Sequence, residues 1–244
     1  MTNPLISIII PAHNEEARLP LALDNICVFS KNQNYQIEVV VVENGSSDRT
    51  LEIAREYASK MPELTVIHED RRGKGLAVQR GMLEAKGDFR FICDVDFSMP
   101  VEELNRFIPP NCSEDISIGS REAPGAVRYN EPAFRHLIGR IFNLMVRIAA
   151  LPGLQDTQCG FKCFRGEVAE KIFPLQTMRG MSFDVEILFI ARRMGYKIVE
   201  VPIPWYFDPD SRVRLVDDSL RMAFDLIHIL RNDRRGVYRI TPKP

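Results

Sequence analysis

The 244-residue sequence lacks a long hydrophobic run. No stretch reaches the roughly 18–20 apolar residues that cross a bilayer, because Arg147, Asp225 and His228 interrupt the longest apolar segments. The first apolar run, 5–10, is also too short for a signal-peptide core. The sequence therefore predicts a cytoplasmic protein, or one that lies on the cytoplasmic face of a membrane without spanning it.

Paired cysteines and an excess of one charge are missing too. The five cysteines, an odd number scattered along the chain, indicate reduced thiols rather than a secreted disulfide framework. The 32 Lys and Arg residues balance 33 Asp and Glu, so bulk electrostatics would not hold nucleic acid, and we expect no such partner. Glycine and proline are near average usage, which argues against a fibrous or disordered chain.

What the first half does contain is an alternation of short β-branched runs with helical patterns. Strands are predicted at 6–10, 37–42, 64–68 and 89–93, and helices at 15–29, 48–60 and 76–86. This spacing predicts right-handed crossovers and a doubly wound α/β fold with a mostly parallel sheet. Such sheets bind ligands at the carboxyl ends of their strands.

The second half is less regular. Strands are predicted at 116–119, 160–165 and 197–203, and helices at 132–150, 183–194 and 216–230. Because no repeat or linker interrupts the chain, we expect a single domain over 1–244. Its nucleotide-binding half would be 1–120 and its acceptor-side half 121–244.

Polar residues follow each of the first four predicted strands, and Asp94 and Asp96 are the most informative pair among them. In extended backbone, residues i and i+2 face the same side, so both carboxylates can converge on one hard cation. A lone Asp-x-Asp often occurs by chance on a protein surface. The predicted strand directly before this pair favours a site for Mg²⁺ or Mn²⁺ and a diphosphate.

A basic loop with two glycines lies after the third predicted strand. Arg72 and Lys74 beside Gly73 and Gly75 are typical of a phosphate-facing loop, whereas Arg71 is interpreted as solvated surface charge. The glycine spacing and the terminal Gly-Lys-Ser/Thr of a P-loop are missing, which argues against an ATPase.

Taken in order, these motifs resemble those of family 2 glycosyltransferases with the GT-A (Rossmann-like) fold, in particular the polyprenyl-phosphate hexose synthases. The matching segments span nearly the whole chain and are 11–16, 41–50, 73–75, 94–96, 119–121, 156–162 and 183–186. The last two are most similar to dolichyl-phosphate β-glucosyltransferases, with the mannosyl branch second. The resemblance implies metal-dependent, inverting transfer of a hexose to a lipid phosphate, with UDP-glucose favoured as donor over GDP-mannose.

The resemblance also implies roles for individual residues. Asp94 and Asp96 would hold the metal, and the nucleotide pocket would contain Pro11, Ala12, Glu15, Glu43, Lys74, Asp94 and Val95. The acceptor or phosphate side would contain Arg121, Arg135, Gln158 and Arg212. Asp156 and Asp184 would complete the catalytic set, with Asp184 acting as a base if the acceptor were a hydroxyl. The alternative for Asp184 is a helix cap.

Two departures from the family pattern bear on the choice of substrate. Glu43-Asn44 stands where the family usually has Asp-Asp, which blurs the preference for uridine over guanosine. Ser98 stands where mannosyl members often carry a metal-binding Gln. Transfer to a sugar hydroxyl and a non-catalytic nucleotide-sugar sensor remain alternatives. A nucleotidyltransferase is disfavoured because no glycine-rich loop follows the first strand.

Two predicted helices, 132–150 and 216–230, are apolar on one face and carry arginines nearby. A helix that packs on the core and exposes a basic face has this pattern. A helix that lies in a membrane interface has the same pattern. Since a lipid phosphate sits at the bilayer surface, we expect a peripheral membrane protein.

Overall fold

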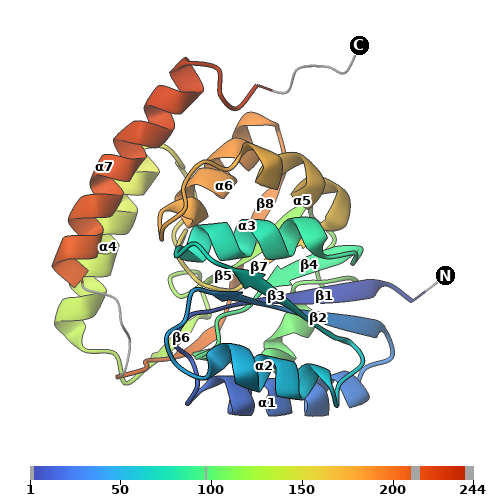
Figure 1. Ribbon diagram of the computed structural model, residues 1–244. Coiled ribbons are helices and arrows are strands. Elements are labelled where there is room, and N and C mark those ends of the chain that lie inside the picture. Colours follow the sequence, from blue (N-terminus) through green and yellow to red (C-terminus); the bar gives the residue numbers. More distant parts are fainter. Residues whose placement is uncertain (1–2, 97, 210–214, 240–244) are drawn as a thin grey trace.

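The computed structural model describes residues 3–96, 98–209 and 215–239. A seven-stranded sheet with the order β3-β2-β1-β4-β7-β5-β8 forms its centre (Figure 1). The strands are β1 (Leu5–Ala12), β2 (Gln36–Asn44), β3 (Leu64–Glu69), β4 (Phe89–Ile92), β5 (Ile116–Ser120), β7 (Lys162–Arg165) and β8 (Ile198–Pro202). Strands β1 to β4 pair in parallel, as do β5 and β8, which confirms the predicted mostly parallel α/β sheet.

Strand β7 is the exception, because it runs antiparallel to both of its neighbours, β4 and β5. It comes from the second half of the chain but lies beside β4 of the first half. One continuous sheet therefore joins the two halves.

Helices cover both faces of this sheet (Figure 1). One face carries α1 (Leu19–Lys31) and α2 (Thr50–Ala58), and the other carries α3 (Lys74–Glu84), α5 (Gly166–Ile172) and α6 (Phe183–Arg193). Two 3₁₀ helices, η1 (Val101–Arg106) and η2 (Phe173–Leu175), complete the layers.

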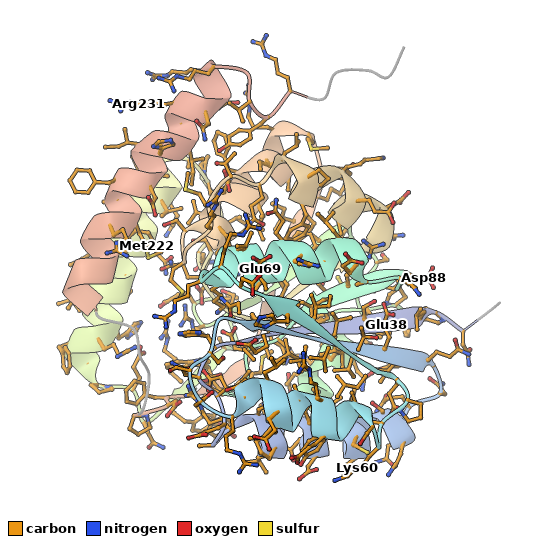
Figure 2. All side chains as sticks on the ribbon, viewed as in Figure 1. Glu38, Lys60, Glu69, Asp88, Met222 and Arg231 are labelled. Atoms are coloured by element: carbon orange, nitrogen blue, oxygen red, sulfur yellow. The ribbon has the colours of Figure 1, made fainter. Side chains whose placement is uncertain are left out.

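Two longer helices, α4 (Ala133–Ala149) and α7 (Leu215–Arg234), lie side by side at one edge of the molecule. Met222 and Arg231 mark the course of α7 in Figure 2. Near the start of α4, β6 (Val127–Tyr129) and β9 (Pro204–Tyr206) form a separate parallel ribbon. Among the described residues, no helix is both long enough and apolar enough to span a bilayer.

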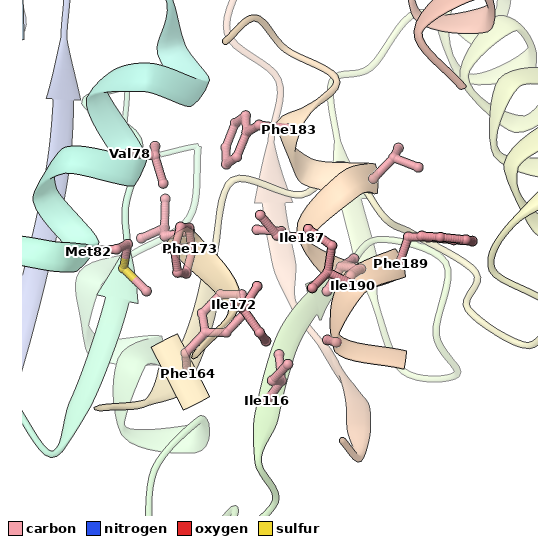
Figure 3. Packing of buried hydrophobic residues seen from close by; sticks show 14 of the residues in the cluster. Val78, Met82, Ile116, Phe164, Ile172, Phe173, Phe183, Ile187, Phe189 and Ile190 are labelled. Carbon is pink, nitrogen blue, oxygen red and sulfur yellow. The ribbon is translucent and has the colours of Figure 1, made fainter. Parts of the chain in front are cut away.

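The core forms because alternate residues of the central strands point to opposite faces. Ile9 and Val40 pack under α3, α5 and α6, whereas Ile8 and Val39 pack under the helices of the other face. Figure 3 shows the first of these clusters, in which Phe164 on β7 packs beside Phe173 with ring centroids 5.3 Å apart.

The first predicted helix begins later than its hydrophobic pattern suggests, at Leu19 rather than at Glu15. Asn14 adopts a left-handed conformation with φ 55°, and the Glu15 backbone N–H donates to the Thr50 side chain at 2.7 Å. This segment is therefore held as a loop against the start of α2, and Pro20 occupies the first turn of α1.

Candidate active site

A cavity of about 530 Å³ opens beside the carboxyl ends of β1 and β4 and receives residues from both halves of the chain. Many of the residues singled out from the sequence line it: Pro11, Glu15, Lys74, Asp94, Val95, Asp96, Arg121, Arg135 and Gln158. The structure thus brings together side chains that lie up to 147 positions apart (Gln158 against Pro11). This is the edge of the sheet where the sequence predicts a site.

The loops after β1 and β2 are joined to each other and form one wall of this cavity. The Asn14 backbone N–H donates to Ser46 Oγ at 3.0 Å, and the Asn14 side chain accepts the Ser47 N–H at 2.8 Å. His13 also bonds the Asn44 carbonyl through Nδ1 at 2.9 Å. Because each loop satisfies polar groups of the other, the wall is fixed before any ligand binds.

Glu43 shapes this wall from behind and is only 1% exposed. Its Oε1 accepts the Ser46 N–H at 2.5 Å, and its Oε2 lies 2.5 Å from His68 Nδ1. The hydrogen bond that His68 donates to Glu43 is the main cause of the raised pKa of His68. Asn44, the next residue, lines the cavity in its place.

Asp94 and Asp96 directly follow β4. Lys74, the first residue of α3, reaches Asp94 from the end of the loop after β3. Lys74 Nζ lies 2.6 Å from Asp94 Oδ1. Burial alone would lower the pKa of Lys74, but the charges of Asp94 and Asp184 outweigh it and raise that pKa. Desolvation, followed by the charge of Asp94, raises the pKa of Asp96. The negative charge of Asp96 is therefore not fully balanced by the protein, and a cation bound nearby would stabilise the ionised carboxylate.

Gly160 gives Asp94 the room that it occupies. A Cβ atom at Gly160 would lie 2.0 Å from Asp94 Oδ2, which no side chain could tolerate. Gly160 itself lines the cavity, so a bare backbone segment supports the carboxylate. The glycine in the matched 156–162 segment thus has a physical reason.

These two carboxylates fit a divalent cation that is bound together with a diphosphate. Mg²⁺ in such sites is held by one or two carboxylates and completes its shell with phosphate oxygens and water. Within the described part of the chain, no group of three or more His, Cys, Asp or Glu side chains is arranged to hold a metal alone.

Arg121 also lines the cavity, and it is held by a fully buried carboxylate. Its Nε and Nη2 lie 2.6 and 2.9 Å from the two oxygens of Asp156, which also accepts the Arg121 backbone N–H at 3.0 Å. Burial alone would raise the pKa of Asp156, but Arg121 holds it well below its usual range. Asp156 therefore positions Arg121 and does not itself line the cavity.

Aromatic side chains complete the lining of the cavity. Trp205 on β9 lies under the Arg121 guanidinium, whose central carbon is 5.3 Å from the ring centroid. Arg135 on α4 lies over Phe207 at 5.1 Å. Cation–π contacts of this kind hold guanidinium groups in place while leaving them charged. Two arginines that line the cavity are thus held against aromatic rings.

An ion-pair bridge links the first and second halves of the chain at this cavity. Arg18, just before α1, contacts Glu15 at 2.7 Å and Asp208 at 2.8 Å, and all three line the cavity. Sequence reasoning missed Arg18, Trp205, Phe207 and Asp208 as site residues. The aromatic cluster at 205–207, next to prolines, was a usable signal, whereas nothing in the pattern distinguished Arg18.

Four predicted site residues are buried and do not line the cavity: Ala12, Glu43, Asp156 and Asp184. Asp184 on α6 is 3% exposed and lies 2.5 Å from Lys162 Nζ. Its burial raises the pKa of Asp184, an effect that Lys162 and Lys74 oppose. Arg212 lies outside the described residues, so its predicted contact with the acceptor phosphate stays a prediction.

The family model described as glycosyl transferase family 2 matches residues 7–173. The chain belongs to this family. It is 34% identical over 248 residues to a dolichyl-phosphate beta-glucosyltransferase of Trichomonas vaginalis, covering 96% of this chain and 73% of the relative. The enzyme of the same name from Saccharomyces cerevisiae is 32% identical, covering 98% and 78%. These findings confirm the resemblance drawn from the motifs.

Solved structures support the fold of this family 2 member. A glucosyl-3-phosphoglycerate synthase from Mycobacterium tuberculosis, in complex with Mn²⁺, UDP-glucose and glycerol 3-phosphate, matches with a TM-score of 0.68 and 22% identity. The match covers 96% of this chain and 80% of that one. The α/β architecture predicted from the alternating pattern is therefore shared with a known sugar-nucleotide enzyme.

Proposed function

We propose that this family 2 member transfers glucose from UDP-glucose to a polyprenyl phosphate such as dolichyl phosphate. One observation carries the proposal: a single cavity is lined by the acidic pair Asp94 and Asp96 with Lys74, and also by the two arginines Arg121 and Arg135. A nucleotide diphosphate with a cation fits the first group, and an acceptor phosphate fits the second. The relatives named dolichyl-phosphate beta-glucosyltransferase support this choice of sugar and acceptor.

On the donor side, Asp94 and Asp96 would hold Mg²⁺ or Mn²⁺ with the diphosphate. When bound, such a cation acts as a Lewis acid that stabilises the charge of the departing nucleotide. Lys74 adds a positive charge next to the same group. Pro11, Glu15 and Asn44 line the nucleoside side. The solved synthase with UDP-glucose and Mn²⁺ supports the choice of uridine donor and metal.

On the acceptor side, the chemistry needs little help from a base. A phosphate monoester is already ionised at neutral pH, so its oxygen can attack the anomeric carbon directly. That oxygen forms the new bond as the bond from the anomeric carbon to the diphosphate breaks, and the electron pair leaves with UDP. Attack opposite the leaving group inverts the anomeric centre. Arg121 and Arg135 would orient the acceptor, with Asp156 holding Arg121 in place.

A lipid-linked acceptor lies in a membrane, so the protein would have to bind the membrane surface. Helix α4 has an exposed apolar face that could make this contact. Its exposed side carries Phe134, Leu137, Ile141, Leu144 and Ile148, which are 53–78% exposed. Phe224 and Ile227 are exposed on α7, which packs beside α4, and Arg231 lies near the end of α7 (Figure 2). Exposed arginines on both helices complement anionic headgroups. Peripheral binding to the cytoplasmic face also fits the five free cysteines.

A transfer assay tests the proposal. Protein, Mn²⁺, dolichyl phosphate and UDP-glucose labelled in the sugar are incubated, and the label in the lipid phase is counted. GDP-mannose is run in parallel. We expect the lipid product to form from UDP-glucose and to depend on added cation. Selective transfer from GDP-mannose would assign the chain to the mannosyl branch, and donor binding without transfer would indicate a sensor.

A further inference from the structure

A buried ion pair lies directly behind the cavity. Lys162 on β7 is fully buried, and its Nζ is 2.5 Å from Oδ1 of Asp184 on α6. Taking two charges out of water is costly, and well-packed apolar side chains often give an equally stable protein. The pair is therefore poorly explained by stability alone.

Lys162 makes a second contact that leads to the donor side of the cavity. Its Nζ also donates to the Cys159 carbonyl at 2.5 Å. That carbonyl is joined by one peptide bond to Gly160, the backbone on which Asp94 rests. Any displacement of Lys162 would therefore move the support of Asp94.

Asp184 is connected to Lys74, the ion-pair partner of Asp94. The chain beside Asp184 lies close to the chain beside Lys74, because a Cβ atom at Gly75 would lie 2.7 Å from the Cβ of Phe183. The Lys162–Asp184 pair is thus connected, through the backbone at Gly160 and at Phe183–Gly75, to both members of the Lys74–Asp94 ion pair, which is 2.6 Å long. At the same time Asp184 faces Lys162 and, within the described structure, does not line the cavity.

We propose that Lys162 and Asp184 are positioning residues that fix the geometry of Asp94 and Lys74 for the donor diphosphate. Lys162 holds the 159–160 backbone under Asp94, and Asp184 holds Lys162. In this account Asp184 takes no proton from the acceptor. The inference rests on the proposed function, since it assumes that Asp94 and Lys74 bind the donor.

A charge-neutral double variant, Lys162→Met with Asp184→Asn, tests this role. It leaves no unpaired charge behind, so we expect it to fold with a melting temperature close to that of the wild type. Titration calorimetry with Mn²⁺ and UDP should nevertheless show binding weakened by about 10- to 100-fold, the range usual for residues that support a metal site from behind. A purely structural pair would leave this affinity unchanged.

Arg90→Met is the matched control. Arg90 is also a buried cation, 4% exposed, and donates to the Met82 carbonyl at 2.7 Å, but it does not line the cavity. We expect this variant to lose thermal stability and keep wild-type affinity for Mn²⁺ and UDP. The control separates a loss of stability from a loss of positioning.

Three outcomes would contradict parts of this account. Wild-type affinity in the double variant would overturn the inference and leave the proposed function standing. Wild-type affinity with abolished turnover in Asp184→Asn alone would also overturn it and indicate a proton acceptor. Failure of the wild type itself to bind Mn²⁺ and UDP would overturn the proposed donor, and the inference with it.

Discussion

At the scale of single residues, the two acids after β4 differ in their surroundings. Asp94 is paired with Lys74, whereas Asp96 has a raised pKa because of desolvation and the charge of its neighbour. A cation bound there would relieve this repulsion. Asp96 is thus the residue at which a charge-neutral substitution should separate donor chemistry from folding.

We expect Asp96→Asn to lower metal-dependent glucose transfer by at least about 100-fold, because a bound cation contributes several kcal/mol of charge stabilisation. The melting temperature should stay the same or rise, since one of two repelling carboxylates is removed. Glu84→Gln on the exposed end of α3 is the control. Equal turnover in Asp96→Asn and the control would contradict the assignment of the metal site.

Gly160 provides a steric test of the same site. In Gly160→Ala the new Cβ would overlap Asp94, so the carboxylate must move. We expect a higher KM for the donor and weaker activation by Mn²⁺, measured in steady-state kinetics. Gly139→Ala, where the added Cβ meets nothing within 4 Å, should leave both unchanged. Unaltered kinetics in Gly160→Ala would show that the position of Asp94 is not critical.

The buried Asp156–Arg121 ion pair should make the free energy of unfolding depend on pH. Its folded-state pKa is lowered by Arg121, so its contribution is complete above the unfolded pKa of about 4 and declines as the pH falls below it. Asp156→Asn leaves Arg121 without its partner and should cost about 3–5 kcal/mol at pH 7. Urea unfolding at pH 7, 5 and 3 should show a smaller acid-induced loss in the variant. Parallel curves would contradict this.

The residues that the sequence could predict are those in loops directly after buried strands, such as Asp94 and Lys74. The carboxyl ends of parallel strands lie at the same edge of a sheet, so the fold class predicted that the loops carrying Asp94 and Lys74 lie close together. The sequence did not indicate in the same way which of the predicted site residues are buried. Glu43 and Asp156 are polar residues in matched motifs, yet their carboxylates are used by Ser46, His68 and Arg121, partners that tertiary packing selects.

At the scale of elements, hydrophobic periodicity predicted the long helices and the buried strands well. Hydrophobic periodicity did not predict the short elements. Helix α5 spans Gly166–Ile172, fewer than two full turns, and the ribbon of β6 and β9 has three residues in each strand. Such pieces carry too few residues to show a period, and packing on the rest of the protein stabilises them.

The apolar face of α4 gives a prediction at this scale. Leu137→Glu with Ile141→Glu should reduce flotation with anionic vesicles by at least about 10-fold, since each exposed side chain buried in lipid contributes about 1.5–3 kcal/mol. Leu21→Glu with Val28→Glu is the matched control, because these side chains are 66% and 63% exposed on α1, which covers one face of the sheet and not the edge where α4 lies. Equal flotation of both double variants would contradict a membrane role for α4.

At the scale of the whole molecule, β7 joins the two halves by pairing antiparallel between β4 and β5. The alternating pattern of the first half could not reveal this insertion, because pairing partners far apart in sequence leave no local signal. Its effect is to place the 156–162 segment, including Gly160, next to Asp94. Asp94 and Asp96 of the first half and Arg121 of the second half therefore line one cavity.

A crystal structure of the protein with Mn²⁺ and UDP-glucose would test the proposed donor site most directly. We expect the cation on the carboxylates of Asp94 and Asp96, the diphosphate beside Lys74, and the glucose directed toward Arg121. A cation or nucleotide bound away from the carboxyl ends of β1 and β4 would contradict this proposal.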